Sequence, residues 1–341
     1  MKTWLALTVT TVMVGGVLPG EAASSPAPAL TAFVGASLFD GTGAAPVDHA
    51  TVLIDGDRIR LAGPSQNVVV PAGARVVHCE GRFIVPGLID AHVHFFQSGG
   101  LYARPDIVNL TYVRSYNHEM SSVKASLGNI WRDYLVNGVT SVVDMGGPMW
   151  NFEVREQARA EALAPAVAVA GPLISTIARW QLDLGDPPII RAGSADEARA
   201  MVKKQLSSKP DLIKVWFVLT PDRTIDEMTG VVRAVVDEAH QAKIRVAVHA
   251  TEAETARIAV EAGADILVHS VTDARVTPEF VKMLADRNVI LIPTLTVMGG
   301  YARVLGGPPE ATLLERQYGD PRAMATWADY AAIRTAATRE S

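Results

Sequence analysis

The hydrophobic residues of the chain gather in short, nearly continuous runs that recur from residue 83 onward. Seven runs rich in Val, Ile and Leu cover residues 83–95, 138–145, 166–172, 211–218, 244–250, 264–270 and 288–297. A run that is apolar at nearly every position is typical of a strand buried on both faces, as in a parallel sheet covered by helices. We therefore expect seven parallel strands.

Amphipathic segments lie between these runs and predict helices. Ser194, Thr224 and Thr251 each precede such a segment as candidate N-caps, and Thr277 precedes one that has Pro278 at its first helical position. Strands that alternate with helices indicate an α/β fold. Because no Gly-rich dinucleotide turn accompanies them, the pattern favours a TIM-type (β/α) barrel, here residues 84–341, over a doubly wound sheet.

The first 30 residues have a different pattern. Residues 1–22 combine a basic start, an apolar run and small residues, which predicts a secretory signal peptide. An uncleaved membrane anchor is the alternative, although the apolar run is short for a membrane span. Residues 23–30 form a linker rich in Pro and Ala. We therefore expect an exported protein, either secreted or periplasmic.

Residues 31–83 predict a small β unit before the barrel. The turn sequence Asp55-Gly56-Asp57 lies between two β-prone pieces and signals a hairpin. The β-prone pieces are residues 32–38, 50–54, 58–62, 68–70 and 75–79.

Composition narrows the range of partners. The 341 residues are 49% hydrophobic and 20% charged with a net charge of −5, which is ordinary for a globular protein. Without long runs of like charge, nothing points to nucleic acid or, after signal cleavage, to a membrane. Cys79 is the single cysteine, so an internal disulfide is excluded, and we expect a buried thiol.

Histidines stand at the ends of three predicted strands. His92 and His94 close the first strand two positions apart, so their side chains share a face. His249 and His269 are each next to last in the fifth and sixth strands. In a barrel the carboxyl ends of the strands meet at the active site. The four rings therefore predict a metal site; a set of hydrogen-bonded structural histidines is the alternative.

Lys214 lies inside the apolar fourth strand, where an ammonium group is costly to bury. Close to metal ions the ammonium would be repelled, unless CO2 converts it to a carbamate whose two oxygens can bridge two metals. The alternative is a lysine whose stem runs to the barrel mouth and leaves its charge in water. His49, His78, His118 and His240 lack a strand-end position.

The segment PGLIDAHVH (residues 86–94) resembles the motif of the metal-dependent amidohydrolase superfamily. TVLIDGDRI (51–59) is similar to the N-terminal β-sandwich of that family. DLIKV (211–215), followed by His249 and His269, resembles the binuclear branch with a carboxylated lysine, and within it the prolidase-like and imidazolonepropionase-related members.

The resemblance implies a role for each site residue. His92 and His94 would hold one metal, His249 and His269 the other, and Lys214, as N6-carboxylysine, would bridge two divalent ions. Zinc is expected, with manganese or cobalt as alternatives. A hydroxide between the metals would cleave an amide bond of a small peptide-like, N-acyl amino acid or cyclic amide substrate. A homo-oligomer is possible.

One expected feature of the family is missing from the sequence. An aspartate at the end of an eighth strand should act as general base, but no β-branched run follows residue 297. Asp144, Asp320 and Asp329 do not match the motif, so we expect a barrel that lacks its eighth strand. The alternatives to an active enzyme are a catalytically impaired chain that at most binds metal, and a fragment that does not fold alone.

Substrate choice in a barrel is set by the loops that follow the strands. Here those loops are residues 97–117, 174–188 and 299–309. They offer aromatic contacts through Tyr102, Tyr112, Tyr116 and Trp180.

Overall fold

The computed structural model describes residues 30–331, which fall into two compact units that divide between Pro86 and Gly87. The predicted signal peptide (1–22) lies outside the described residues, as does nearly all of the predicted linker (23–30). Within residues 30–331, no helix is long and apolar enough to cross a membrane.

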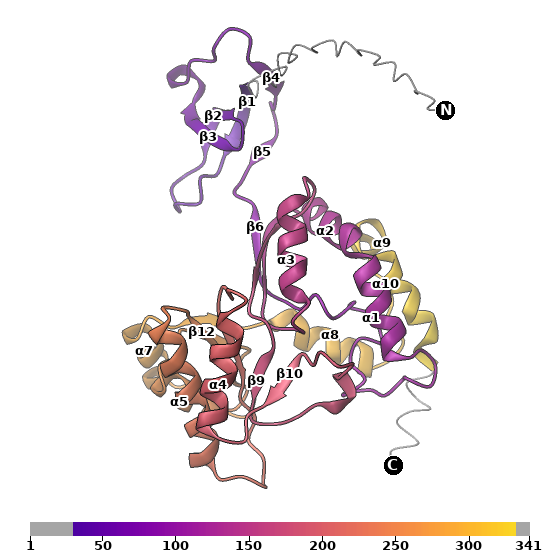
Figure 1. Cartoon of the computed structure of the whole chain (residues 1–341). Helices are drawn as coiled ribbons and strands as arrows, with labels where there is room; N and C mark the ends of the chain where they lie inside the picture. The colour runs from indigo at the N-terminus through magenta and orange to yellow at the C-terminus, as the bar shows by residue number, and fades with distance from the viewer. Residues whose placement is uncertain (1–29, 332–341) are drawn as a thin grey trace, which may run out of the picture. The chain divides into compact units, whose positions relative to one another are not determined.

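The N-terminal unit is one mixed sheet with the order β3-β2-β1-β4, in which β5 also pairs with β1 (Figure 1). Strands β2 and β3 are antiparallel and turn at Gly56, whose φ is +60°, as the Asp-Gly signal predicts. The strands are β1 (Thr31–Leu38), β2 (Val47–Asp55), β3 (Arg58–Pro64), β4 (Arg75–His78) and β5 (Phe83–Ile84).

Two expectations for this unit need correction. The described residues form a single sheet rather than the sandwich that the family resemblance implies. Residues 68–70 are not a strand, because the 3-10 turn η1 (Ser65–Asn67) ends the hairpin and Val68 packs into the core beside Ala32 and Leu53.

The larger unit has an α/β fold with parallel sheets, and every strand pair in it is parallel. One sheet has the order β6-β7-β8 and the other the order β10-β9-β11-β12-β13-β14. The seven predicted strands are all present in chain order, the third (166–172) as β8. Strands β9 and β10 were not predicted, and β9 lies partly in the predicted loop 174–188. The strands are β6 (Leu88–Val93), β7 (Val139–Asp144), β8 (Ala166–Val169), β9 (Leu173–Ser175), β10 (Ile189–Arg191), β11 (Ile213–Trp216), β12 (Val246–His249), β13 (Ile266–Val268) and β14 (Ile290–Ile292).

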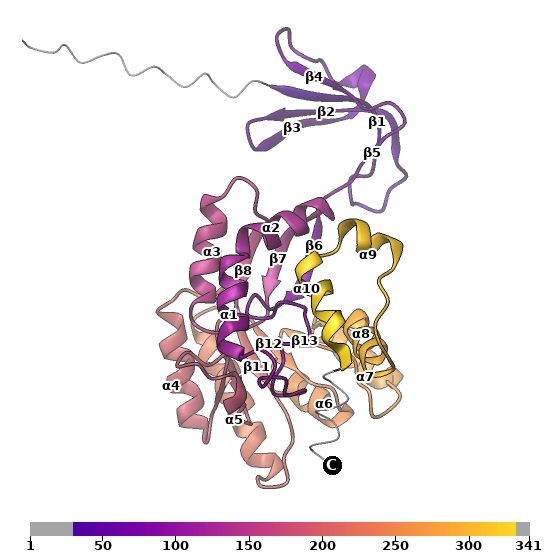
Figure 2. The same ribbon diagram turned by 90° about the vertical axis from the view of Figure 1, so that its right-hand side faces the viewer.

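Helices lie on the outside of these strands (Figures 1 and 2). Ser194, Thr224 and Thr277 cap α4, α5 and α7 as predicted, whereas α6 is capped by Glu252 rather than by Thr251. The helices are α1 (Tyr116–Ala125), α2 (Leu127–Val136), α3 (Asn151–Ala160), α4 (Ala195–Leu206), α5 (Ile225–Gln241), α6 (Ala253–Glu261), α7 (Pro278–Asp286), α8 (Leu295–Leu305), α9 (Leu313–Tyr318) and α10 (Pro321–Ala325), with 3-10 turns η2 (Trp180–Leu182) and η3 (Thr326–Tyr330).

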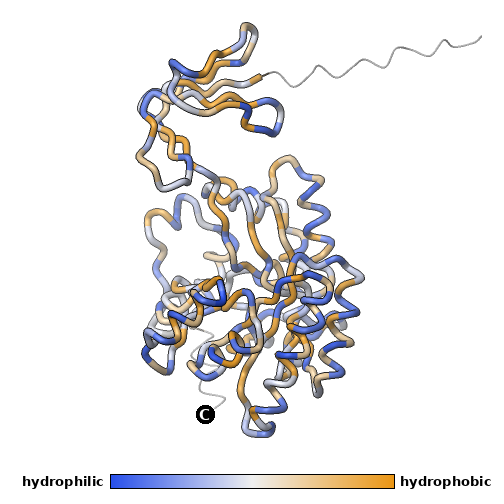
Figure 3. The backbone as a smooth tube through the Cα atoms, turned by 90° about the vertical axis from the view of Figure 1, so that its left-hand side faces the viewer, coloured by the Kyte–Doolittle hydropathy of each residue, from blue (hydrophilic) through white to orange (hydrophobic). Residues whose placement is uncertain are grey.

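The main hydrophobic core lies between helix α5 and strands β11 and β12. Val231 and Val235 of α5 are fully buried, as are Ile213 and Val248 of the two strands. The hydropathy of the chain follows this arrangement, with apolar stretches along the strands and mixed stretches along the helices (Figure 3). Burial of this apolar surface is the main favourable term in folding, and it fixes the positions of the strand ends.

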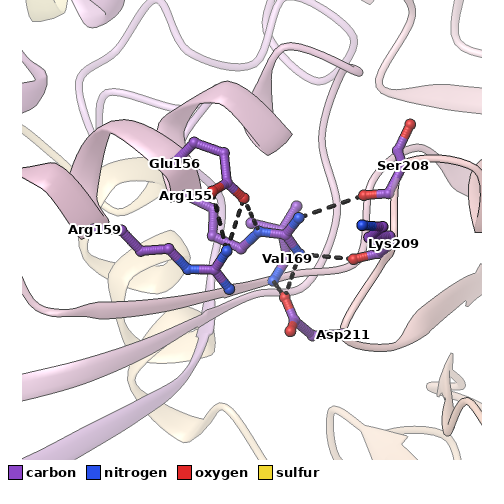
Figure 4. Close-up of polar contacts among 7 residues, drawn as sticks. All are labelled: Arg155, Glu156, Arg159, Val169, Ser208, Lys209 and Asp211. Carbon is purple, nitrogen blue, oxygen red and sulfur yellow. Dashed lines mark hydrogen bonds and ion pairs between the residues drawn. The ribbon is translucent and has the colours of Figure 1, made fainter.

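The two parallel sheets meet at Asp211, which comes just before β11. Its backbone N–H donates to the carbonyl of Val169 at 3.0 Å, and its carboxylate accepts from the Val169 N–H at 2.8 Å. The buried Arg155 of α3 donates to the same carboxylate at 2.9 Å and to the carbonyl of Lys209 at 2.8 Å (Figure 4). These contacts join β8 of one sheet to β11 of the other.

Strands β6 and β14, like β8 and β10, each have a single strand neighbour among the described residues; for β6 it is β7 and for β14 it is β13. Their apolar side chains are correspondingly exposed, with Ile89 at 67% and Leu291 at 47%. The unpaired backbone groups of such an edge strand can form hydrogen bonds with another strand. Within residues 30–331, no strand pairing joins β6 to β14.

The region after β14 differs from the prediction. The predicted strand 288–297 is reduced to β14, because Pro293 lacks an N–H and Thr294 turns the chain with φ +49°. Helix α8 begins at Leu295, so the predicted loop 299–309 is largely helical. Helices α9 and α10 then pack near α2, where Asn137 donates to the carbonyl of Tyr318 and Arg322 pairs with Asp133 (Figure 2).

We expect Arg155→Met to lower the free energy of unfolding by about 2 kcal/mol, because the Asp211 carboxylate and the Lys209 carbonyl lose a buried charged donor. The matched control is Arg159→Met, which removes an exposed arginine that also pairs with Glu156 (Figure 4). Urea unfolding should place the control within about 0.5 kcal/mol of the parent protein. Equal effects of the two substitutions would contradict this role of Arg155.

Candidate functional site

The carboxyl ends of β6, β11, β12 and β13 bring five residues to one cavity. His92 lies in β6, with His94 just after it, Lys214 lies in β11, His249 ends β12, and His269 follows β13. Ring centroids are 4.9 Å apart for His92 and His94, 5.0 Å for His92 and His269, and 4.5 Å for His249 and His269. All five side chains line the same cavity of about 810 Å³.

The hydrogen bonds of His94 fix its tautomer. Its Nδ1 lies 2.7 Å from the carbonyl oxygen of Gly146, and since a carbonyl can only accept, Nδ1 carries the hydrogen. The Nε2 atom therefore keeps a lone pair that faces His92, whose Nε2 is 3.0 Å away. The other nitrogen of His92, Nδ1, is buried without a partner among the described residues.

His269 is held in an unusual backbone conformation. Its φ is +77°, and Thr294, its hydrogen-bond partner, has a φ of +49°. The contact between His269 Nδ1 and Thr294 Oγ1 is 2.6 Å. Left-handed backbone at a residue other than glycine costs about 1–3 kcal/mol and gathers at functional sites. The fold therefore maintains strain in order to present this ring to the cavity.

Burial keeps the four imidazoles neutral. Loss of solvation is the largest cause that lowers the pKa of each ring, and repulsion from the Lys214 amine lowers all four further. The pKa falls to about 3 for His94 and to about 4 for His269. At neutral pH each ring therefore has a nitrogen lone pair available.

Lys214 is buried, with 1% of its surface exposed, so it does not extend to the solvent as the alternative reading of the sequence allowed. Its Nζ makes no hydrogen bond within the described residues. Burial lowers the pKa of the amine to about 7, so a large fraction of it is neutral near physiological pH. A neutral amine that faces a cavity is a nucleophile rather than a structural charge.

Asp144, which ends β7, supports the turn that carries the His94 acceptor. One carboxylate oxygen accepts from the Gly146 N–H at 3.1 Å, and the other accepts from the side chain of Asn151. Burial raises the pKa of Asp144 to about 8, although both hydrogen bonds oppose that rise. A Cβ at Gly147 would meet the Asn151 amide at 2.1 Å, so this position requires glycine. The Asp-Met-Gly-Gly sequence is the signal that could have indicated this support.

The walls of the cavity differ from those predicted. The aromatic residues that line it are Phe96, Tyr134, Trp216, Tyr301 and Tyr318. The predicted aromatic contacts from Tyr102, Tyr112, Tyr116 and Trp180 are not among the lining residues. Tyr102 is buried instead and donates to Asp329, and Trp180 is exposed.

The carboxylate of Asp90 also lies at the cavity, whereas His118 and His240 lie outside it. Asp90 lines the cavity, but it accepts a hydrogen bond from the His92 backbone, and the sequence analysis left it without a role. Within residues 30–331, no three His, Cys, Asp or Glu side chains are arranged so that they could hold a metal ion as they stand. His240 pairs with Asp265, and His118 is exposed on α1.

We expect Lys214→Met to stabilise the chelator-treated protein by about 1–3 kcal/mol at pH 7, because the variant no longer buries an unpaired amine. The folded-state pKa of about 7 lies below the ordinary value of 10.5. Between these values the unfolded chain binds a proton that the folded chain does not, so parent stability rises with pH. The gain should therefore shrink toward about pH 10 in urea titrations. A loss of stability at pH 7 would show that the amine is paired.

The chain resembles known proteins in sequence and in fold. An imidazolonepropionase of Streptomyces griseus is 41% identical over 63 residues, which are 18% of this chain and 16% of the relative. A 5-methylthioadenosine/S-adenosylhomocysteine deaminase of Symbiobacterium thermophilum is 25% identical over 173 residues, 45% of this chain and 34% of the relative. The chain thus spans no more than about a third of these relatives.

A solved prolidase complexed with N-methylphosphonate-L-proline has the same fold. Its TM-score is 0.62 at 23% identity, over 88% of this chain and 72% of the prolidase. The model of the amidohydrolase family matches residues 83–322, well over half of the sequence. The chain therefore belongs to the amidohydrolase family.

Proposed function

We propose that this protein is a hydrolase that cleaves a carbon–nitrogen bond of a small substrate with the help of divalent metal ions. One observation carries the proposal: four neutral imidazoles and an unpaired, buried lysine amine face one cavity at the carboxyl ends of parallel strands. The family, the match to an imidazolonepropionase and the match to a deaminase support chemistry at carbon–nitrogen bonds.

The residues present fit a divalent metal. A histidine that donates one N–H to a carbonyl, as His94 does to Gly146, is oriented as metal-ligating histidines usually are. Two nitrogens bound to one tetrahedral zinc ion lie about 3.3 Å apart, and the two Nε2 atoms of His92 and His94 are 3.0 Å apart. His92 and His94 would hold one ion, and His249 and His269 the other. Zinc fits best, since imidazole is among its usual ligands.

Lys214 would contribute as a carbamate. Its neutral amine would attack the carbon of CO2, so that an N–C bond forms, one C=O π bond opens with its electron pair moving to oxygen, and the nitrogen loses a proton to water. The product is an anion in place of an unpaired amine, and its two oxygens could lie between the ions. We propose this modification because the Nζ atom is buried without a partner and faces the four rings.

The remaining groups orient the substrate and the donor rings. When bound, the metal ions polarise the scissile carbonyl and activate the attacking water. Asp144 holds the turn whose Gly146 carbonyl orients His94, and Thr294 orients His269. Phe96 and Trp216 form an apolar part of the cavity wall near these groups. Because apolar surroundings lower the local dielectric constant, they strengthen electrostatic interactions inside the cavity.

We propose a class of substrate and a cellular location for this protein. The proposed substrates are small peptide-like molecules, N-acyl amino acids or cyclic amides. The solved prolidase, whose ligand carries a proline, shares the fold and supports this range. We also propose an exported protein, secreted or periplasmic, on the basis of the predicted signal peptide (1–22).

A catalytically impaired, metal-binding chain with an incomplete barrel is the second candidate. The cavity carboxylates Asp90, Asp133 and Asp320 come from β6, α2 and the start of α10, and none follows an eighth strand within the described residues. The open edges of β6 and β14 favour the same view. Lack of a general base would lower the rate by about 10²–10⁴-fold without preventing metal binding.

We expect about two divalent ions per chain in protein purified with zinc and bicarbonate, measured by elemental analysis. His249→Ala should lose about one ion and at least about 100-fold in the rate of hydrolysis of N-acyl amino acids. His118→Ala, an exposed histidine outside the cavity, is the matched control. Two ions with no hydrolysis would favour the impaired chain, and no bound metal would overturn both candidates.

We expect Asp144→Ala to weaken zinc binding by about 10–100-fold, because the Gly146 carbonyl that orients His94 loses its support. Asp144→Asn keeps an oxygen for the Gly146 N–H and should lose much less. Competition with a zinc-binding dye measures both affinities. Equal affinity in Asp144→Ala and the parent protein would rule out this support.

A further inference from the structure

We infer that Arg104 receives a carboxylate of the substrate, so that the cavity selects N-acyl amino acids or peptides with a free carboxyl end over neutral amides. The inference rests on the proposed function and narrows its substrate class. The Arg104 side chain lines the same cavity as the four histidines.

The guanidinium of Arg104 has one edge occupied and one edge open. Its Nε and Nη2 atoms each donate at 2.8 Å to the two carboxylate oxygens of Asp106. The Nη1 atom makes no hydrogen bond to any described residue, and Nη2 has a second hydrogen. A guanidinium can bind one carboxylate on its Nε–Nη2 edge and another on its Nη1–Nη2 edge. The second edge is therefore available to a planar, bidentate anion.

The local charge favours a monoanion. Asp106, whose side chain is 1% exposed, is shared between Arg104 and Arg179, whose Nε lies 3.6 Å from it. Two guanidinium groups and one carboxylate leave one positive charge in excess. A substrate carboxylate would neutralise that charge, whereas a phosphate dianion would leave a negative charge in excess.

The loop that carries Arg104 is held in place before any ligand arrives. The backbone N–H of Leu101 donates to the hydroxyl of Thr326 at 3.1 Å, and the hydroxyl of Tyr102 donates to Asp329 at 2.7 Å. Asp106 then fixes the guanidinium itself. A fixed donor loses little conformational entropy when it binds its ligand, so its contribution to selectivity is large.

Arg179 provides a matched control. It pairs with the same Asp106 carboxylate, but it stacks over Trp216 at 4.9 Å and is not among the residues that line the cavity. Loss of Arg104 removes both 2.8 Å hydrogen bonds to Asp106, whereas loss of Arg179 removes only the 3.6 Å ion pair. A purely structural role for Arg104 would therefore lower the stability of Arg104→Met and leave the preference for acids over amides unchanged, whereas carboxylate binding would change that preference.

The test compares four N-acetyl-L-amino acids (Leu, Met, Phe and Pro) with their C-terminal amides on the zinc-loaded, full-length protein. Calorimetry gives the affinity, and product assays give kcat/KM. We expect the parent protein to prefer at least one acid over its amide by about 100-fold. Arg104→Met should lower that ratio to near one, Arg104→Lys should give an intermediate ratio, and Arg179→Met should keep the parent ratio.

The outcomes separate this inference from the proposed function. Binding that depends on the carboxyl group and on Arg104, without hydrolysis, supports the inference and contradicts only the proposed catalysis. Hydrolysis with no preference for the acids, or with a preference that survives in Arg104→Met, overturns the inference and leaves the hydrolase in place. Absence of binding for all four acids overturns the inference as well. Arg104→Lys keeps the test valid if Arg104→Met does not fold.

Discussion

The structure depends on one costly constraint, which is an amine buried among four imidazoles with no partner of its own. Lys214 lies in β11, its side chain is almost fully buried, and its Nζ makes no hydrogen bond within the described residues. A buried, unpaired charge is destabilising, so its pKa falls until the amine becomes largely neutral. A core that needed nothing from this position would place an aliphatic side chain here. The cost is consistent with a functional role for the amine.

The rest of the larger unit positions the four histidine rings around that amine. The parallel register of β11, β12 and β13 places His249 opposite Trp216 and opposite Val268, the residue before His269. Lys214 lies two residues before Trp216 on β11. The junction of Asp211 with Val169 and Arg155 holds the two sheets together between β8 and β11. Polar groups then orient individual rings, such as the Gly146 carbonyl beside His94. Rigid strands and short hydrogen bonds together give the fixed geometry that catalytic groups need.

Much of this arrangement could be predicted from the sequence. Apolar runs identified the parallel strands, and the alternation of side chains along a strand placed His92 and His94 on one face. The sequence could not reveal the turn at Thr294, because its left-handed backbone depends on the contact with His269 and on Pro293 beside it. Leu295, Thr296 and Val297, which follow that turn, therefore begin helix α8 instead of continuing the strand. The predicted loops 97–117 and 299–309 do contribute Arg104 and Tyr301 to the cavity. Which side chains of those loops reach it depends on tertiary packing that no local pattern encodes, so the predicted aromatic contacts were wrong.

Detection of a carbamate on Lys214 tests the central claim most directly. The protein would be loaded with zinc in ¹³C-bicarbonate, and its ¹³C spectrum compared with that of Lys214→Met prepared in the same way. We expect one carbamate resonance in the parent protein, lost on removal of the metal and absent in Lys214→Met. A parent protein that holds two ions per chain without that resonance would contradict the account.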